Sequence, residues 1–229
     1  MIQVEVWSDI VCPWCYIGKR RLETALSRYD GAVTVEWRSY QLDPSTPVGD
    51  PRPVGESLAA RKGLSASQVK GMFAQVTQIA ADEGLAYDFD RARTANTLDA
   101  HRLLHFAKGA GLQAALKERL MHAYFTEGAD IGDQAVLVGL AGAVGLDEVA
   151  AKQALADGSY AADVRADIAT AREYGINGVP FFVFNQRVGV SGAQPVEVFE
   201  QALRQSSLTV LGTPSSSSGD ACADDSCAI

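Results

Sequence analysis

Two cysteines, Cys12 and Cys15, are separated by Pro13 and Trp14 near the start of the chain. Two residues between cysteines at the start of a helix place the sulfur atoms one helical turn apart, where they can close a disulfide with little backbone movement. The free N–H groups and the positive dipole end at such a position favour thiolate over thiol. This spacing indicates redox chemistry, with Cys12 as the nucleophile and Cys15 as the deeper, resolving thiol.

A C-x-x-C pair can also supply half of a structural zinc site, which needs two further ligands. The other two cysteines of the chain are Cys222 and Cys227. Their C-x-x-x-x-C spacing in a flexible tail is wide for the second half of a zinc ribbon. A C-x-x-C motif beside a β-α-β pattern is typical of redox proteins, so we predict a redox pair and no metal.

The elements around the cysteine pair can be predicted from residue patterning. Residues 3–7 mix β-branched and aromatic residues with polar ones and predict a strand. Pro13 opens a helical pattern that runs from residue 14 to 28, and residues 33–40 alternate apolar and polar side chains as a second strand does. A strand, a helix and a strand predict a parallel pair joined by the helix.

A long helical region follows a proline-rich connector at residues 44–53. Ser65 and Gln68 have the spacing of a capping box. Helices are predicted around residues 66–79, 98–108, 112–125, 134–144, 148–157 and 161–174.

Strand character returns near the end of the chain. Residues 179–185 form a continuous apolar run, as in a strand buried on both faces, and a turn at Gln186-Arg187 leads into residues 188–191. Pro195 introduces a helix over 196–204. A β-α-β opening and a β-β-α close, separated by helices, predict an α/β domain interrupted by an all-helical one.

Composition excludes several classes of protein. The chain has 229 residues, 47% of them hydrophobic, which is typical of a soluble globular protein that needs no disulfides for stability. A net charge of −8 and the lack of a basic run argue against nucleic acid. The most apolar helical stretch, residues 135–146, is far shorter than the roughly 20 residues that span a membrane. The first residues show no signal-peptide pattern, so a cytoplasmic protein is expected, although a chain that had lost a leader would look the same.

Three features together resemble the thioredoxin superfamily: the cysteine motif between strand and helix, Gly178-Val179-Pro180 before a late hairpin, and the helical insertion. The insertion resembles the DsbA-like branch. Ser8–Gly18 (SDIVCPWCYIG) and Asn96–Leu103 (NTLDAHRL) resemble FrnE-type proteins, DsbA relatives usually found in the cytoplasm. The resemblance spans residues 2–208. With the patterning it predicts a thioredoxin fold over 1–45 and 173–211, a helical insertion domain over 46–172 and a Ser-rich tail over 212–229.

The resemblance implies that Pro180 is a cis proline facing the cysteine pair and that the backbone of Val179 pairs with an extended substrate. An ordinary trans proline at a strand start is the alternative that the sequence allows. Strongly oxidising DsbA relatives carry a histidine in the second slot between the cysteines, where this chain has Trp14. Cys12 is therefore expected to be moderately acidic and its disulfide less oxidising.

Several weaker signals surround the motif. Asp9 could be a carboxylate that influences Cys12, but a role as a strand-end or capping residue is favoured. His101 and His105 have the i, i+4 spacing of a metal-binding pair, without a third ligand, so hydrogen-bonded helix residues are favoured. Within the resemblance, Trp14 and His101 are candidate substrate-binding residues. Further aromatic residues could line an apolar surface around the disulfide or could simply be core: Trp7, Tyr16, Trp37 and Phe181.

Cys222 and Cys227 follow a Ser/Gly linker in the tail. About ten flexible residues reach roughly 17 Å, so these thiols could visit Cys12. The pair could therefore be an auxiliary redox pair that exchanges with the first; such a second couple recurs in some FrnE-like proteins. Incidental cysteines in a disordered tail, or a weak metal-binding end, are the alternatives.

Three functions are compatible with these observations. The leading hypothesis is a protein disulfide oxidoreductase or isomerase that needs no cofactor and acts on protein or peptide thiols and disulfides, with glutathione or a thioredoxin system as exchange partner. The second is a glutathione-dependent isomerase or transferase of a small aromatic or polyketide-like substrate, as in hydroxychromene-carboxylate isomerases and kappa-class transferases. Those enzymes typically have serine where Cys12 stands. The third is a non-catalytic binding or chaperone module.

Overall fold

The computed structural model describes residues 1–50 and 52–207. The strands and helices follow the order predicted from patterning, except that α2 was not among the predicted helices. Within the described residues no helix is long and apolar enough to cross a membrane. The elements are β1 (Ile2–Ser8), α1 (Pro13–Ser27), β2 (Val33–Ser39), α2 (Val54–Lys62), α3 (Ala66–Asp82), α4 (Leu98–Gly109), α5 (Gln113–His122), the π-helical turn η1 (Ala123–Glu127), α6 (Gln134–Ala143), α7 (Glu148–Ala156), α8 (Ala161–Glu173), β3 (Phe181–Phe184), β4 (Val188–Ser191) and α9 (Val196–Ser207).

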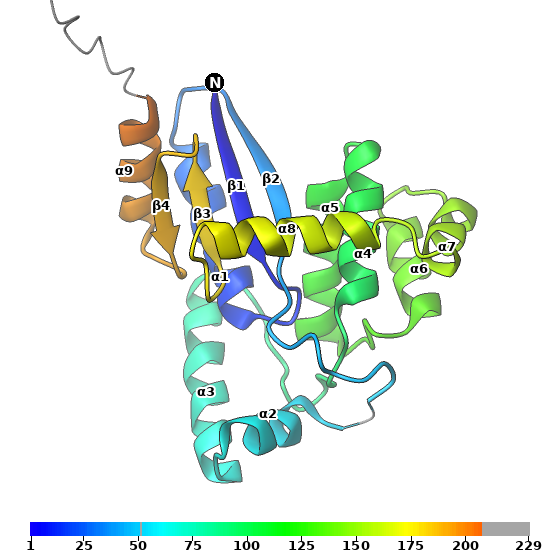
Figure 1. Cartoon of the computed structure of the whole chain (residues 1–229). Coiled ribbons are helices and arrows are strands. Elements are labelled where there is room, and N and C mark those ends of the chain that lie inside the picture. The colour runs from blue at the N-terminus through cyan, green and yellow to red at the C-terminus, as the bar shows by residue number, and fades with distance from the viewer. Residues whose placement is uncertain (51, 208–229) are drawn as a thin grey trace, which may run out of the picture.

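The four strands form one sheet in the order β2-β1-β3-β4 (Figure 1). β1 and β2 are parallel, with Val4 opposite Val35, which confirms the pair predicted from the β-α-β pattern. β3 is antiparallel to β1, with Val6 opposite Phe182, and continues through a hairpin into β4. β1 is thus an inner strand, and the cysteine motif follows its carboxyl end.

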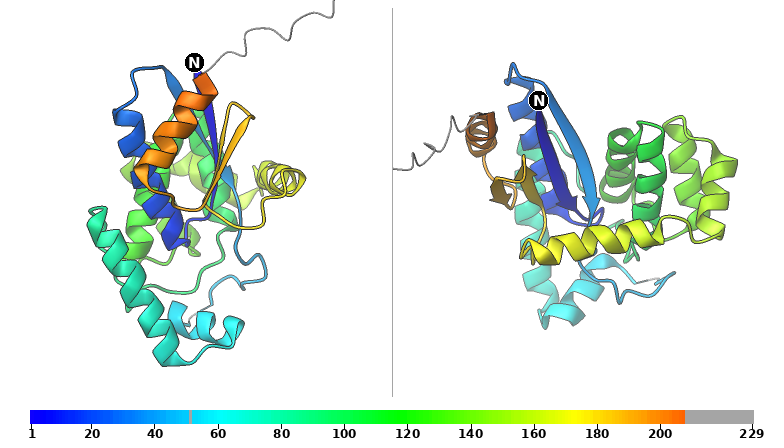
Figure 2. Two further views of the ribbon diagram at one scale, coloured as in Figure 1. Left: turned by 90° about the vertical axis from the view of Figure 1, so that its left-hand side faces the viewer. Right: turned by 45° about the horizontal axis from the view of Figure 1, so that its top comes forward.

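Helices cover both faces of the sheet: α1 and α9 lie on one face and α8 on the other (Figure 2). On the first face Val6, Phe182 and Phe199 belong to one buried cluster. On the second face Trp7 and Val183 pack with residues of α8 and the segment after it. The side chains of β3 therefore alternate between two buried faces, as its continuous apolar run predicted.

The helices from α2 to α7 form the predicted helical insertion. Many of its buried residues, among them Leu103, Leu120 and Phe125, belong to one cluster that also contains Cys12 and Cys15. The cysteine pair thus lies where the helical insertion packs against the thioredoxin-like part. Packing between two segments distant in sequence therefore determines the surroundings of both sulfur atoms.

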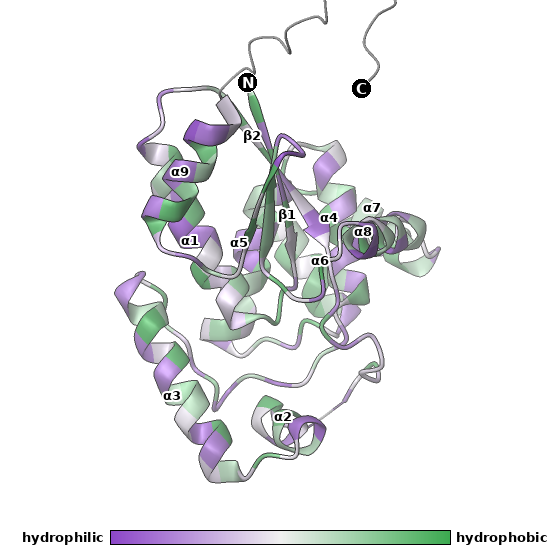
Figure 3. Cartoon of the chain, turned by 60° about the vertical axis from the view of Figure 1, so that its left-hand side comes forward, coloured by the Kyte–Doolittle hydropathy of each residue, from purple (hydrophilic) through white to green (hydrophobic). Residues whose placement is uncertain are grey.

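Helix α3 begins with the predicted capping box. The amide of Gln68 donates to Ser65 Oγ at 3.3 Å, and the amide of Ser65 donates to Gln68 Oε1 at 2.8 Å. Hydropathy colouring shows hydrophobic residues along the sheet strands and alternating hydrophobic and hydrophilic residues along α3 (Figure 3). The capped N-terminus stabilises a helix that is only partly covered by the rest of the chain.

Three local features differ from the sequence-based expectation. The hairpin turn is centred on Asn185 and Gln186, which have φ of 48° and 54°, one residue earlier than predicted. The helix predicted over 112–125 ends at His122 and continues as η1. Helix α8, which the sequence placed in the helical insertion, also lies against the sheet. Asp167 of α8 accepts a hydrogen bond from the Ser39 amide of β2 at 2.8 Å, so this helix contacts both the insertion and the sheet. The domain boundaries at 45–46 and 172–173 stay predictions.

Candidate active site

Cys12 and Cys15 lie where β1 passes into α1. Cys12 occupies the N-cap position, with φ −89° and ψ 112°, and Pro13 is the first helical residue. The amide of Cys15 donates to the carbonyl oxygen of Cys12 at 3.0 Å. Both cysteines are free thiols with exposed fractions of 3% and 1%. The helix start is where the sequence predicted it, but the predicted difference in exposure between the two thiols is small.

The segment before β3 lies opposite the sulfur of Cys12. Cys12 Sγ donates a hydrogen bond to the carbonyl oxygen of Val179 at 3.5 Å. The Val179–Pro180 peptide bond is cis, and Pro180 is buried. Gly18 permits this packing, because a Cβ atom there would lie only 3.1 Å from Pro180 Cγ. The structure thus brings Cys12, Val179 and Pro180 together, while contact of a substrate with Val179 stays a prediction.

The Cys12 thiol differs from the moderately acidic thiol expected from the sequence. A hydrogen bond with Cys15, burial of the sulfur and the negative charge of Asp9 raise the pKa of Cys12 well above its ordinary value. The backbone amide of Cys15 favours the thiolate, but its effect is smaller. The backbone amide at the helix start therefore does not outweigh the hydrogen bond with Cys15 and the burial of the sulfur, both of which raise the pKa of Cys12.

Asp9 is a buried carboxylate three residues before Cys12. Its Oδ1 atom accepts from the Ile10 amide at 2.8 Å and lies 3.2 Å from Nε2 of His101, and its Oδ2 atom accepts from the Leu42 amide at 2.8 Å. Asp9 directly follows β1, as favoured for a strand-end residue, but it does not cap α1, because the N-cap residue is Cys12 and the two Asp9 carboxylate oxygens accept from amides outside the helix. Burial acts to raise the pKa of Asp9, but its hydrogen bonds and the charge of His101 lower it overall.

His101, a candidate substrate-binding residue, has an exposed fraction of 0%. Burial lowers the pKa of His101, although Asp9 acts in the opposite direction. A neutral imidazole beside a carboxylate oxygen carries its proton on the nitrogen that faces that oxygen, here Nε2. The ring thus joins helix α4 to the segment before Cys12 from inside the protein and does not reach the surface in this structure.

The sequence and structure comparisons agree with this geometry. Residues 3–204 match the model of the DSBA-like thioredoxin domain family. The chain belongs to this family. The crystal structure of a probable DsbA oxidoreductase from Streptomyces coelicolor is 42% identical, with 100% of this chain and 99% of that chain covered and a TM-score of 0.88. Protein YwbO of Bacillus subtilis (strain 168) is 31% identical over 209 residues, which cover 88% of this chain and 96% of YwbO.

Two more distant solved structures share the fold of this DSBA-like chain. The cytosolic disulfide reductase DsbM from Pseudomonas aeruginosa with GSH is 20% identical, with coverage of 89% and 98% and a TM-score of 0.62. A 2-hydroxychromene-2-carboxylate isomerase is 18% identical, with coverage of 89% and 95% and a TM-score of 0.69. These two show a common fold alone. The predicted DsbA-like thioredoxin fold with its helical insertion is confirmed.

Lys117, on α5, is a buried cation near the site of this DSBA-like protein that sequence reasoning missed. Its exposed fraction is 0%, and Nζ donates to the carbonyl oxygen of Ser8 at 3.5 Å and lies 5.8 Å from the centre of the Trp37 ring. Burial lowers the pKa of Lys117 to about 8, although the charges of Cys15 and Asp9 act in the opposite direction. Lysine ends usually reach solvent, so nothing in the local sequence marks this one as buried.

Trp14 is the exposed side chain of the cysteine motif, with an exposed fraction of 41%, a position compatible with the predicted contact with substrate. Sequence reasoning also missed Tyr87, whose hydroxyl donates to the carbonyl oxygen of Pro13 at 2.8 Å. Three of the aromatic residues that could have lined an apolar surface around the cysteines are buried in the core instead: Trp7, Tyr16 and Trp37.

The two histidines of α4 do not converge on one point. His105 Nε2 lies 3.1 Å from Ser39 Oγ and 3.1 Å from Oδ2 of Asp167 on α8, whereas His101 faces Asp9. The rings are hydrogen-bonded helix residues, which is the interpretation that the sequence favoured. Over residues 1–50 and 52–207, no group of three or more His, Cys, Asp or Glu side chains could hold a metal ion.

Proposed function

We propose that this chain is a thiol–disulfide oxidoreductase of protein or peptide disulfides, with Cys12 as the nucleophile and Cys15 as the resolving thiol. The supporting observation is the position of Cys12 Sγ, at the N-cap of α1 and 3.5 Å from the carbonyl oxygen of Val179. An extended substrate that bonds to the backbone of Val179 would replace the thiol as its partner and bring a substrate sulfur toward Cys12.

The exchange needs no group beyond the two cysteines. In the reductive direction the Cys12 thiolate attacks one sulfur of the substrate disulfide, and the second substrate sulfur leaves as a thiolate that takes up a proton. Cys15 then attacks Cys12 Sγ, which releases the first substrate sulfur as a thiol and leaves a Cys12–Cys15 disulfide. Two electrons pass from the enzyme to the substrate, and glutathione or a thioredoxin system re-reduces the pair. Oxidation of a substrate runs through the same steps in reverse.

The isomerase alternative makes no use of the second thiol. A glutathione-dependent isomerase needs no group that resolves a mixed disulfide, whereas this chain holds two free thiols within one helical turn. The non-catalytic alternative uses neither sulfur. Exchange chemistry is therefore the function that accounts for both Cys12 and Cys15.

Variants of the two cysteines test this proposal. With a labelled peptide disulfide as substrate, we expect Cys12→Ser to abolish exchange and Cys15→Ser to accumulate a mixed disulfide with Cys12 that mass spectrometry detects. Cys12→Ser protein that exchanges at the parent rate would overturn the proposal. Peptide binding by a parent protein that exchanges no disulfide would favour the chaperone module, and turnover of a hydroxychromene carboxylate by Cys15→Ser protein would favour the isomerase.

The finer assignments belong to the same proposal. The motifs at residues 8–18 and 96–103 support the FrnE-type subgroup and a cytoplasmic location. Cytosolic DsbM, solved with GSH, supports glutathione as an exchange partner. Cys222 and Cys227 lie outside the described residues, and their role as an auxiliary redox pair stays a prediction.

A further inference from the structure

Helices α2 and α3 and the segment 87–90 enclose a groove of about 810 Å³. Its walls carry aromatic side chains. Phe73 of α3 stacks on Phe89 with 4.1 Å between ring centroids, and Tyr87 meets Phe89 edge-on at 5.7 Å. The groove therefore offers apolar surface to an occupant, in a part of the fold separate from Val179 and Pro180.

Tyr87 connects this groove to the cysteine motif. Its side chain lines the groove, and its hydroxyl donates to the carbonyl oxygen of Pro13, next to the exposed Trp14. Arg21 of α1 forms an ion pair with Glu83 at 2.6 Å, which holds the end of α3 against α1. Figure 1 shows α3 running from beside α1 toward α2. The groove therefore starts near the cysteines and leads away from them along α3.

The length of the groove suits an extended chain. Residues of α3 from Ala66 to Ala81 line it. At a rise of 1.5 Å per residue these positions span about 22 Å. An extended polypeptide covers that distance with about seven residues, at roughly 3.3 Å each. A small aromatic molecule would occupy only part of it, so the dimensions favour a peptide segment.

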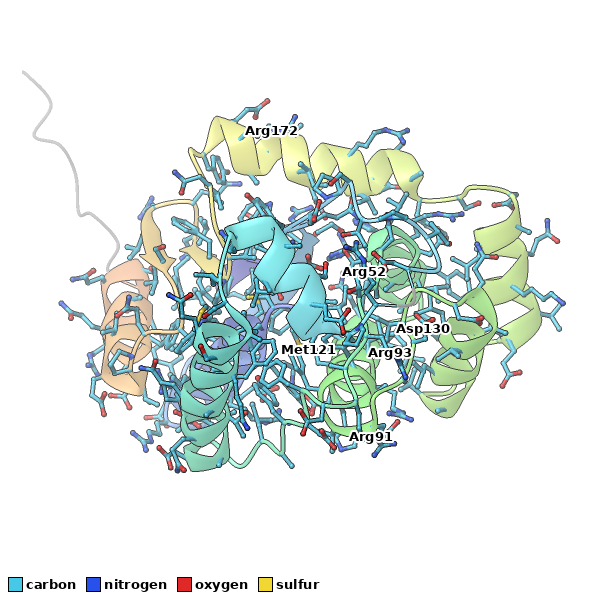
Figure 4. All side chains as sticks on the ribbon, turned by 90° about the horizontal axis from the view of Figure 1, so that it is seen from below. Arg52, Arg91, Arg93, Met121, Asp130 and Arg172 are labelled. Atoms are coloured by element: carbon cyan, nitrogen blue, oxygen red, sulfur yellow. The ribbon has the colours of Figure 1, made fainter. Side chains whose placement is uncertain are left out.

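The rim of the groove is acidic. Seen from below, Arg52 lies on the far side of α2 from α3 (Figure 4), where it forms an ion pair with Asp50 at 2.6 Å, and its charge also acts on Glu56. A negative rim attracts lysine and arginine side chains and repels acidic ones. Three carboxylates and one ammonium group line the groove: Glu56, Asp88, Asp90 and Lys70.

We propose that this groove binds the part of a polypeptide substrate that flanks its reactive cysteine, and that it selects segments combining aromatic or aliphatic residues with lysine or arginine. Apolar side chains of the segment pack on Phe73 and Phe89, and its cations lie against the rim carboxylates. The inference rests on the proposed exchange function and adds to it the class of substrate. Acidic or wholly polar segments bind poorly at the same cysteines.

Charge reversal on the rim tests the electrostatic part. Two peptides are compared, each as the disulfide of two identical copies. Both peptides contain one cysteine and two phenylalanines, and they differ only in that one has three lysines where the other has three glutamates. We expect the full chain to show a lower KM for the lysine peptide, and Glu56→Lys/Asp90→Lys to raise that KM by about three- to tenfold, an effect that weakens with salt. The matched control is Asp30→Lys/Glu148→Lys. It reverses the same number of charges, at one aspartate in a loop and one glutamate in the first turn of a helix, but away from the groove. An unchanged KM, or an equal change in the control, would overturn the proposal.

A second variant tests the apolar part. Phe73→Ala should raise the KM for the phenylalanine-containing peptide and leave a serine-substituted peptide unaffected. Exchange with glutathione disulfide must stay at the parent rate in every variant, which shows that the protein is folded and its cysteines are intact. Failure of the parent protein with every disulfide would instead contradict the proposed function. If Phe73→Ala slows only a small aromatic disulfide, or dissociates a dimer of the parent chain, the groove holds a small molecule or a second copy and the peptide proposal fails.

Discussion

Nε2 of His101 lies 3.2 Å from Oδ1 of Asp9, although 92 positions separate the two residues in the chain. His101 is on helix α4 of the insertion, and Asp9 directly follows the inner strand β1. Both side chains are essentially inaccessible to solvent, with exposed fractions of 0% and 1%. This contact therefore couples the helical insertion to the segment that positions Cys12.

Replacing His101 with leucine should lower the free energy of unfolding by about 2–3 kcal/mol, because the charged Asp9 carboxylate loses a hydrogen-bond donor while it stays buried. Urea unfolding at pH 7 measures this difference. His122→Leu is the control, because that side chain is 48% exposed and should change stability by less than about 0.5 kcal/mol. An equal decrease in the free energy of unfolding in the two variants would show that the contact between His101 and Asp9 does not stabilise the protein.

Stability should also fall as the pH drops below about 6.5, the ordinary pKa of histidine. The pKa of His101 is lowered in the folded protein, so its contribution is complete above that value and is lost as the pH falls toward the folded pKa. The pKa of Asp9 is lowered in the folded protein as well. The stability that the charged Asp9 carboxylate contributes is therefore lost only at more acidic pH, below about 4. Between pH 7 and 5 the profile of His101→Leu should be flatter than that of the parent. Parallel profiles would contradict this assignment.

Alkylation of the reduced protein should modify Cys12 before Cys15, because Cys12 is at the N-cap of α1 and is slightly more exposed, at 3% against 1%. The rate of alkylation should still increase above pH 9. The thiolate is the reactive species, and the pKa of Cys12 is raised by its hydrogen bond with Cys15 and by burial. Limiting iodoacetamide followed by peptide mapping identifies the modified sulfur. First labelling of Cys15 would reverse the roles of the two cysteines, and a rate that levels off near pH 7 would indicate an acidic Cys12.

Lys117→Met should stabilise the protein by about 1–3 kcal/mol at pH 7, because a buried ammonium group is replaced by an apolar side chain of similar size. The same change should slow alkylation of the cysteines, because Lys117 and the charge of Cys15 attract each other. Thermal unfolding and the alkylation rate are measured on the same samples. Lys152→Met, on the exposed surface of α7, is the control and should change neither quantity. Faster alkylation of Lys117→Met would contradict the predicted electrostatic effect.

The tail gives a prediction that rests on sequence alone. Cys222→Ser/Cys227→Ser should leave Cys12 reactive but change the turnover of a protein disulfide, if the second pair exchanges with the first within one molecule. Nearby negative charge disfavours a thiolate, and Asp224 and Asp225 stand between these cysteines in the sequence, so this exchange is expected to be slow at neutral pH and faster at higher pH. Identical turnover of parent and variant in oxidase, reductase and isomerase assays would assign the tail no redox role.

The sequence by itself determined what depends on neighbouring residues. Cys12 and Pro13 predict a helix start because capping and the fixed φ of proline act within one turn. The alternation of residues 33–40 and the apolar run of 179–185 predict the strands and the hairpin in the same way. The family resemblance, carried by these local motifs, predicted the interrupted thioredoxin fold.

Only the tertiary structure decided what surrounds the sulfur atoms. The contact of His101 with Asp9, the burial of Lys117 and the hydrogen bond from Tyr87 to Pro13 join residues that lie dozens of positions apart, so no local pattern encodes them. The same is true of the pKa of Cys12. Its position at a helix start favours the thiolate, but burial and the neighbouring Cys15 disfavour it, and their balance depends on how the insertion packs over the motif.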